Sequence, residues 1–119
     1  MRRSTSGLFC AKLLADLGAR VVKVEPPAGD SSRGMGPFPG DLPDPEKSGA
    51  YLSLNTNKLG ITLSLETAGG RELLLQLVDS ADVLIENYPP SYLPGLGLDF
   101  ATLHARNPRL VMASITPFG

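Results

Sequence analysis

Short apolar runs alternate with helical patterns of about ten residues, and this alternation constrains the fold more than any other feature. The runs that read as buried strands are RVVKVE, DVLIE and LVMASI. A further strand is predicted over residues 61–66, where Ile61, Leu63 and Leu65 alternate with polar side chains. Because strands joined through helices pair in parallel, the predicted class is α/β, a Rossmann-like parallel sheet with helices on both faces.

Three helices are predicted, one before the first of these strands and two between later ones. The first covers residues 7–18, with Cys10, Leu13, Leu14 and Leu17 on one face and a glycine at its end. Thr67 is placed to cap the second, over residues 69–80. The third begins after Asp99, has Leu98 and Leu103 in the positions of a hydrophobic staple, and ends at Asn107-Pro108.

Residues 26–50 interrupt this order. They contain six prolines and five glycines, too many for a regular helix or strand, so a long surface loop is predicted. We expect it to lie within a single partial domain that spans residues 1–119. That domain is expected to be truncated at both ends, because no apolar strand precedes the first helix and the sequence stops directly after its last strand.

Composition excludes several classes of protein. With 11 basic and 12 acidic residues the net charge is −1, which argues against nucleic acid as a partner. One cysteine, Cys10, and one histidine, His104, form neither a disulfide nor a zinc cluster, so no metal is expected. No apolar run approaches the roughly 20 residues of a membrane span. No signal peptide is visible at the start, and we predict a cytoplasmic protein without a membrane partner.

In parallel sheets ligands bind beyond the carboxyl ends of the strands. In this sequence those ends are Glu25-Pro26, Leu65-Glu66, Glu86-Asn87-Tyr88 and Ile115-Thr116. Acids at strand ends are also common as solvated residues, and Arg33, Lys47 and Lys58 could bind phosphate or simply lie on the surface. The glycine-rich stretch GMGPFPG has Pro39 where a dinucleotide fingerprint needs a glycine. From the residues alone, the chain is a ligand-binding α/β layer.

Two long parts of the sequence are distinctive: GLFCAKLLADLGARVVKVEPPAGDSSRGMGP, and the run from LNTNKLGITLSLE through ADVLIENYPP to NPRLVMASITPFG. Together they resemble the N-terminal part of the family III CoA-transferases. This family includes formyl-CoA and carnitine CoA-transferases and α-methylacyl-CoA racemases. The resemblance implies a CoA-binding domain of an enzyme that works as a homodimer of interlocked rings. It implies acyl-CoA and a carboxylic acid as substrates, and an aspartyl anhydride and thioester as intermediates.

The resemblance also implies particular CoA contacts. The matching positions are Thr5, Ser6, Pro26, Leu63, Ser64, Leu65, Glu66, Asn87, Tyr88 and Pro89. Pro26 and Gly95 stand where some members have arginine, so Arg33 is the candidate for the phosphate charge of CoA. The family's catalytic aspartate falls beyond Gly119, and no residue of this chain is assigned a catalytic role.

Other readings stay open at this point. One is a non-catalytic CoA-binding or assembly module, and another is an acyl-CoA racemase of the same family. A nicotinamide-dependent dehydrogenase domain is less favoured, because the glycine fingerprint is missing. The identities of the acyl donor and acceptor do not follow from these residues.

Overall fold

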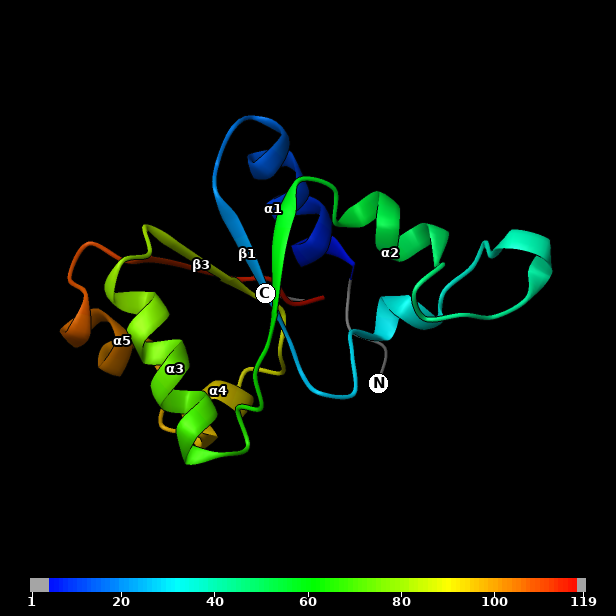
Figure 1. The fold of residues 1–119 in the computed structure, drawn as a ribbon. Helices are drawn as coiled ribbons and strands as arrows, with labels where there is room; N and C mark the ends of the chain where they lie inside the picture. Colours follow the sequence, from blue (N-terminus) through cyan, green and yellow to red (C-terminus); the bar gives the residue numbers. More distant parts are fainter. Residues whose placement is uncertain (1–4, 118–119) are drawn as a thin grey trace. The chain divides into compact units, whose positions relative to one another are not determined.

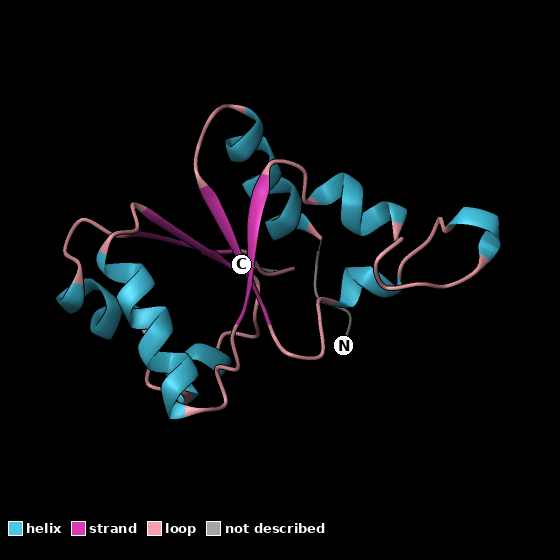
Figure 2. Ribbon diagram, viewed as in Figure 1, coloured by secondary structure: helices cyan, strands magenta, loops and turns pink. Residues whose placement is uncertain are grey.

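The computed structural model describes residues 5–117. The chain divides into two compact units, Met1–Thr62 and Leu63–Gly119. Each unit contains one pair of parallel strands together with its own helices (Figures 1 and 2). The predicted α/β class with parallel strands is therefore confirmed.

The first unit is built around the parallel pair β1 and β2, which run in register from Val21 opposite Lys58 to Glu25 opposite Thr62. Helices α1 and α2 contact each other, and α1 also contacts β1. Its elements in chain order are α1 (Ser6–Asp16), β1 (Val21–Glu25), the 3-10 turns η1 (Ser31–Gly34) and η2 (Pro39–Asp41), α2 (Gly49–Leu54) and β2 (Lys58–Thr62).

The second unit is built around the parallel pair β3 and β4, whose last residues, Glu86 and Ser114, lie opposite each other. Helices α3 and α5 pack together (Figure 1). Its elements are α3 (Ala68–Asp79), β3 (Val83–Glu86), α4 (Tyr92–Gly95), α5 (Phe100–Arg106) and β4 (Val111–Ser114). The predicted second and third helices and the strands at DVLIE and LVMASI are confirmed in position.

The predicted strand over residues 61–66 was wrong at both ends. Strand β2 covers Lys58–Thr62, because the five residues of β1 offer hydrogen-bonding partners only to these positions. The chain turns afterwards, and the Thr67 amide donates to the Ser64 carbonyl at 3.3 Å. Leu65 is buried in this turn, at 7% exposure, so the alternation of apolar residues continued past the strand itself.

The first helix does not bury the face that its leucines suggested. Leu13, Leu14 and Leu17 are exposed by 47%, 38% and 86%, whereas Gly7 and Ala15 are buried. Small residues allow a helix to lie close to its neighbours, which explains why α1 packs through this side. Gly18 has a φ of 105°, the left-handed conformation expected of a glycine that ends a helix.

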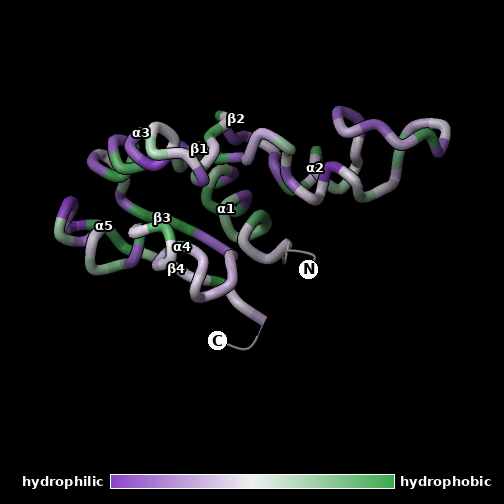
Figure 3. The backbone as a smooth tube through the Cα atoms, turned by 90° about the horizontal axis from the view of Figure 1, so that it is seen from below, coloured by the Kyte–Doolittle hydropathy of each residue, from purple (hydrophilic) through white to green (hydrophobic). Residues whose placement is uncertain are grey.

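The core of the second unit lies between its two longer helices. Leu74 and Val78 of α3 are buried, as is Leu103 of α5, and Leu98 lies fully inside just before α5. Hydrophobic and hydrophilic residues alternate along α3, as an amphipathic helix requires (Figure 3). Burial of Leu98 and Leu103 agrees with the predicted hydrophobic staple. Among residues 5–117, no helix has the length and apolar character needed to cross a membrane.

Candidate functional site

A buried carboxylate marks the carboxyl end of β1. Glu25, the last residue of that strand, is only 7% exposed. Its two oxygens accept hydrogen bonds from Arg33 Nε and Nη2, both at 2.9 Å, and from the Tyr51 hydroxyl. Burial by itself would raise the pKa of the Glu25 carboxyl, but the hydrogen bonds from Arg33 and Tyr51 outweigh burial and lower it to about 2. Glu25 is therefore an ionised structural centre at neutral pH.

The Arg33 guanidinium makes hydrogen bonds to several segments of the first unit. Besides the paired bonds to Glu25, Nη2 donates to the Tyr51 hydroxyl at 2.9 Å. Its Nη1 donates to the Pro45 carbonyl at 3.1 Å and, more weakly, to exposed Glu46 at 3.4 Å. The guanidinium also lies 3.8 Å from the centre of the Tyr51 ring, a cation–π contact. Burial and the hydrogen bond to Glu25 raise the pKa of the Tyr51 hydroxyl to about 12.

A second carboxylate fixes the turn that follows β1. Asp30 accepts from Lys23 Nζ at 2.8 Å and from the Ser32 amide at 2.8 Å, so it caps the turn η1. The Asp30 amide itself donates to Glu25 at 2.9 Å. Burial would raise the pKa of Asp30, but hydrogen bonds from Lys23 and Ser32 lower it. Asp30 and Glu25 are thus linked directly at the carboxyl end of β1.

The proline-rich segment is anchored to its own unit by two serines that are almost fully inside, Ser32 and Ser48, at 1% and 0% exposure. Ser48 Oγ donates to the Ser32 carbonyl at 2.8 Å and accepts from the Tyr51 amide at 3.1 Å, which caps α2. Residues 26–50 therefore hold two 3-10 turns and the start of a helix in addition to irregular backbone.

The two lysines that were phosphate candidates have partners nearby. Lys58 Nζ donates to the carbonyls of Leu8 at 2.8 Å and Leu54 at 2.9 Å, and to Asn55 Oδ1 at 2.8 Å. Its three protons thus match three acceptors. Lys47 is exposed and lies 3.6 Å from a carboxylate oxygen of Asp44. Lys58 serves the fold of the first unit.

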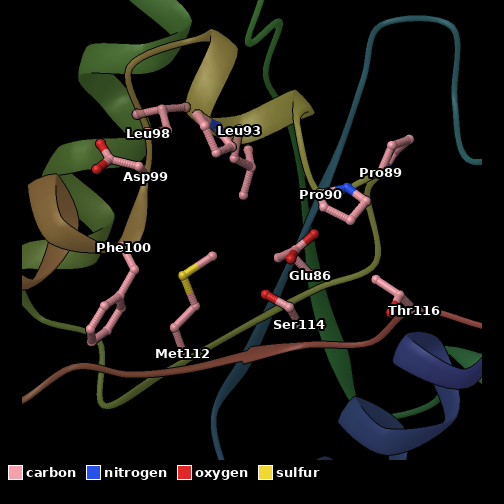
Figure 4. Close-up of a pocket in the computed structure, with 11 residues that line it drawn as sticks. Glu86, Pro89, Pro90, Leu93, Leu98, Asp99, Phe100, Met112, Ser114 and Thr116 are labelled. Atoms are coloured by element: carbon pink, nitrogen blue, oxygen red, sulfur yellow. The ribbon is translucent and has the colours of Figure 1, made fainter. Parts of the chain in front are cut away.

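In the second unit a pocket of about 480 Å³ opens beyond the ends of β3 and β4 (Figure 4). Its wall is mostly apolar, with a few oxygen atoms from the strand ends. The lining residues are Glu86, Pro89, Pro90, Leu93, Pro94, Leu98, Asp99, Phe100, Met112, Ser114 and Thr116. Pockets of this size and character commonly take small molecules.

One face of the sheet lines this pocket and supplies its polar groups. Met112, Ser114 and Thr116 are spaced by two residues, so their side chains point the same way. Ser114 lies opposite Glu86, and Figure 4 shows both side chains at the pocket. Glu86 also accepts the Tyr88 amide at 2.7 Å, which fixes the start of the loop. The Thr116 hydroxyl oxygen is buried and has no hydrogen-bond partner among the described residues.

Two tyrosines connect the loop after β3 with the turn after β2. The rings of Tyr88 and Tyr92 stack, with centroids 4.4 Å apart. The Tyr92 hydroxyl donates to Glu66 Oε1 at 2.7 Å. Two of the predicted CoA contacts, Glu66 and Tyr88, are therefore brought together through Tyr92, which the sequence had not singled out.

The other predicted contacts lie in one unit or the other. In the first, Thr5 and Ser6 are at the start of α1, and Pro26 follows β1 directly. In the second, the turn before α3 contains Leu63, Ser64 and Leu65, and the loop after β3 contains Asn87 and Pro89. Of these residues, Pro89 lines the pocket.

Several pocket residues escaped prediction. Thr116 already belonged to the strand ends expected to face a ligand. Ser114 could have been found as well, because the period of two in LVMASITP places it on one face with Met112 and Thr116. Leu93, Leu98 and Phe100 gave no such signal, since only folding of the loop around α4 brings them to the strand ends. In the described part of the chain, no group of three or more acidic, histidine or cysteine side chains could hold a metal ion.

Parallel strands with a pocket beyond their carboxyl ends define the class of α/β ligand-binding domains. Comparison with known proteins specifies the family. The model of CoA-transferase family III matches residues 1–119, and the chain belongs to this family.

Its curated relatives are CoA-transferases. The chain is 45% identical over 113 residues to the succinyl-CoA:(R)-benzylsuccinate CoA-transferase subunit BbsE of Thauera aromatica, covering 95% of this chain and 28% of that protein. It is 42% identical over 119 residues to a formyl-CoA:oxalate CoA-transferase of Streptomyces avermitilis, covering 100% of this chain and 28% of that one. The chain thus spans less than a third of these relatives.

Solved structures agree with this membership. A CaiB/BaiF family protein from Brucella suis superposes with a TM-score of 0.84 at 39% sequence identity. The match covers 98% of this chain and 31% of that one. Both the fold and the family suggested by the sequence are therefore confirmed.

Proposed function

We propose that this chain forms part of the CoA-binding region of an enzyme that moves CoA between an acyl-CoA and a carboxylic acid. The observation that carries the proposal is the apolar pocket beyond β3 and β4, in a chain whose relatives are named as CoA-transferases. A racemase and a non-catalytic module stay as alternatives, but the named relatives favour transfer.

The pocket suits the pantetheine arm of CoA, which is a flexible, largely apolar chain that carries two amides. Leu93, Leu98 and Met112 offer apolar contact along such an arm. The buried hydroxyl of Thr116 can donate to an amide carbonyl, and Glu86 can accept from an amide N–H. Proline at positions 89 and 90 stiffens the loop, which lowers the entropy lost when a ligand orders it.

In the proposed reaction a carboxylate attacks the thioester carbonyl of the donor. The carbon–sulfur bond breaks, CoA leaves as a thiolate, and a mixed anhydride forms on the enzyme. The thiolate then attacks the enzyme carbonyl, which releases the donor acid and leaves an enzyme thioester. The acceptor carboxylate repeats both steps in reverse. This nucleophile is an aspartate beyond the present chain, and residues 5–117 act by binding CoA.

Other parts of the proposal concern the whole protein. We propose that it works as a homodimer, as expected for the family, and that it acts in the cytoplasm on acyl-CoA and a carboxylic acid acceptor. Thr5, Ser6, Pro26, Asn87 and Tyr88 stay proposed CoA contacts. The residues of the turn before α3 and Pro89 are also proposed CoA contacts.

A transfer assay tests this function. The protein that carries this chain is incubated with succinyl-CoA, acetyl-CoA or formyl-CoA and a panel of carboxylic acids, and new thioesters are identified by mass spectrometry. We expect a new acyl-CoA with at least one pair. Binding of CoA without any transfer would favour the non-catalytic module, and exchange of a substrate α-proton without transfer would favour the racemase.

A pocket-filling variant tests where CoA binds. Ser114→Leu places a larger apolar side chain at the mouth of the pocket and should weaken CoA binding by about tenfold or more, because it occupies the volume that the ligand needs. Ser80→Leu changes an exposed serine at the end of α3 and is the matched control. Equal CoA affinity of the two variants would contradict this location.

A further inference from the structure

The turn that follows β1 lies where ligands of parallel sheets bind, and it depends on side chains for its shape. After Glu25 the chain reverses through Pro26, and the Gly29 amide donates to the Pro26 carbonyl at 2.9 Å. Gly29 has a φ of 84°, a conformation that other residues rarely adopt. A side chain at Gly29 would also place its Cβ 3.2 Å from Arg33 Cδ. The turn is therefore packed directly against Arg33.

Glu25 and Arg33 link this turn to more distant parts of the unit. The paired hydrogen bonds between them join the end of β1 to η1. Arg33 also contacts α2 through the Tyr51 hydroxyl, and it contacts the loop before α2 through the Pro45 carbonyl. Charge-assisted, paired bonds of this kind are stronger and more directional than neutral ones. With Glu25 and Arg33 only 8% and 21% exposed at their side chains, solvent screens the pair weakly.

The same contacts leave Arg33 no spare donor for a phosphate. A guanidinium has five N–H groups. Two of those of Arg33 bind Glu25, and the others bind Tyr51, the Pro45 carbonyl and Glu46. A phosphate contact would have to break one of these bonds, and only the bond to exposed Glu46, at 3.4 Å, is weak. Arg33 is better suited to shaping backbone than to binding the ligand.

We propose that Arg33 is a positioning residue for CoA: through Glu25 and Tyr51 it holds the turn at residues 26–29 in the shape that contacts the cofactor. This inference rests on the proposed function, since it assumes that CoA is the ligand. It replaces the earlier expectation of a direct phosphate contact from Arg33. Glu25 and Tyr51 then belong to the same hydrogen-bond network, which supports the turn.

The two roles of Arg33 predict different behaviour for Glu25. If Arg33 positions the turn, Glu25→Gln and Arg33→Ala disrupt the same hydrogen-bond network, so each should weaken CoA binding by about fivefold to fiftyfold. The double variant should then be no weaker than the worse single one. If Arg33 binds phosphate, Glu25→Gln frees the guanidinium, and CoA binding should be unchanged or tighter.

The experiment is calorimetric titration of CoA into the protein that carries this chain and into the three variants. Arg106→Ala is the matched control, because Arg106 also pairs with a carboxylate, Asp79, but on the exposed surface of the second unit. Addition of ethylguanidinium should restore much of the CoA affinity of Arg33→Ala, and Arg33→Lys should restore less, since an ammonium cannot form the paired bonds.

The outcomes separate the two proposals. Weak binding by Glu25→Gln and Arg33→Ala, without additivity and with rescue by guanidinium, supports the positioning role. Normal binding by Glu25→Gln with weak binding by Arg33→Ala overturns it in favour of a phosphate contact. Normal binding by both overturns it as well. If the unmodified protein does not bind CoA at all, the proposed function fails, and the inference fails with it.

Discussion

Gly70 lies directly beneath the carbonyl of Ser64: a Cβ at position 70 would stand 1.8 Å from that oxygen. Thr67 holds the same turn, since its hydroxyl donates to the Ser64 carbonyl at 2.9 Å and accepts from the Gly70 amide at 3.0 Å. This confirms the predicted cap. Helix propensity alone disfavours two adjacent glycines at a helix start, but only glycine fits at position 70.

Gly70→Ala should therefore destabilise the protein by about 2–4 kcal/mol, because the backbone has to move to admit a methyl group. Gly69→Ala is the control, since a Cβ there meets nothing within 4 Å. It should be neutral or stabilise by up to about 1 kcal/mol, through better helix propensity and a less flexible unfolded chain. Urea denaturation of both variants measures the difference. Equal stabilities would contradict the close approach at Gly70.

Glu25 should make stability depend on pH. Its pKa is lowered from 4.5 to about 2 in the folded protein, so the folded state favours the ionised carboxylate. The resulting stability is fully present above about pH 4.5 and is lost as the pH falls toward 2. The full effect is on the order of 3 kcal/mol.

The measurement is the difference in unfolding free energy between the protein and its Glu25→Gln variant, at several pH values from 7 downward. We expect the variant to be less stable at neutral pH and the gap to shrink as the pH is lowered. Glu46→Gln, at an exposed partner of Arg33, should show a small and nearly constant gap. A gap for Glu25→Gln that stays constant down to the acid limit would contradict the lowered pKa.

Asn107 connects the two longer helices of the second unit. It is 5% exposed, and its amide nitrogen donates to the carbonyls of Val78 and Ala81, both at 2.8 Å. Asn107→Asp replaces these donors by a carboxylate that faces two carbonyl oxygens. It should cost about 2–4 kcal/mol in unfolding free energy, more than Asn107→Ala. Thermal denaturation of the two variants gives the order, and a more stable Asn107→Asp would exclude this role.

Thr116 offers a test that separates binding from folding. Thr116→Val keeps the shape of the side chain but removes a buried hydroxyl that has no partner among the described residues. Loss of an unsatisfied polar group should leave stability unchanged or raise it by up to about 1 kcal/mol. If the hydroxyl binds the ligand, CoA affinity should fall by about threefold to tenfold. Unchanged affinity would remove Thr116 from the proposed site.

Regular periodicity made most of the elements predictable. The apolar stripe of α3 and the capping signals at Thr67 and Asp99 located two helices closely, and β-branched runs located β1, β3 and β4. Asp99 does occupy the N-cap position of α5, but its side chain makes no capping hydrogen bond. Helix α2 was not predicted, because its six residues, GAYLSL, are too short to show a period of 3.6. Its start depends on the buried Ser48, whose role appears only once the loop has folded.

The site was predictable only in part, for a related reason. Strand ends pointed to Glu25, Glu86 and Thr116, since the edge of a parallel sheet follows from strand direction alone. What each side chain does there depends on neighbours distant in sequence. The sequence suggested Arg33 as a phosphate ligand, whereas the positioning role that we propose for it depends on Glu25 and on Tyr51, 18 residues away, which accept its hydrogen bonds.

The central claim is that this chain carries a binding surface for CoA, and calorimetric titration of the protein that contains it with CoA, followed by NADH, tests that claim most directly. We predict saturable binding of CoA, weakened by Ser114→Leu and not by Ser80→Leu, and no comparable binding of NADH. Binding of NADH without binding of CoA would contradict the account.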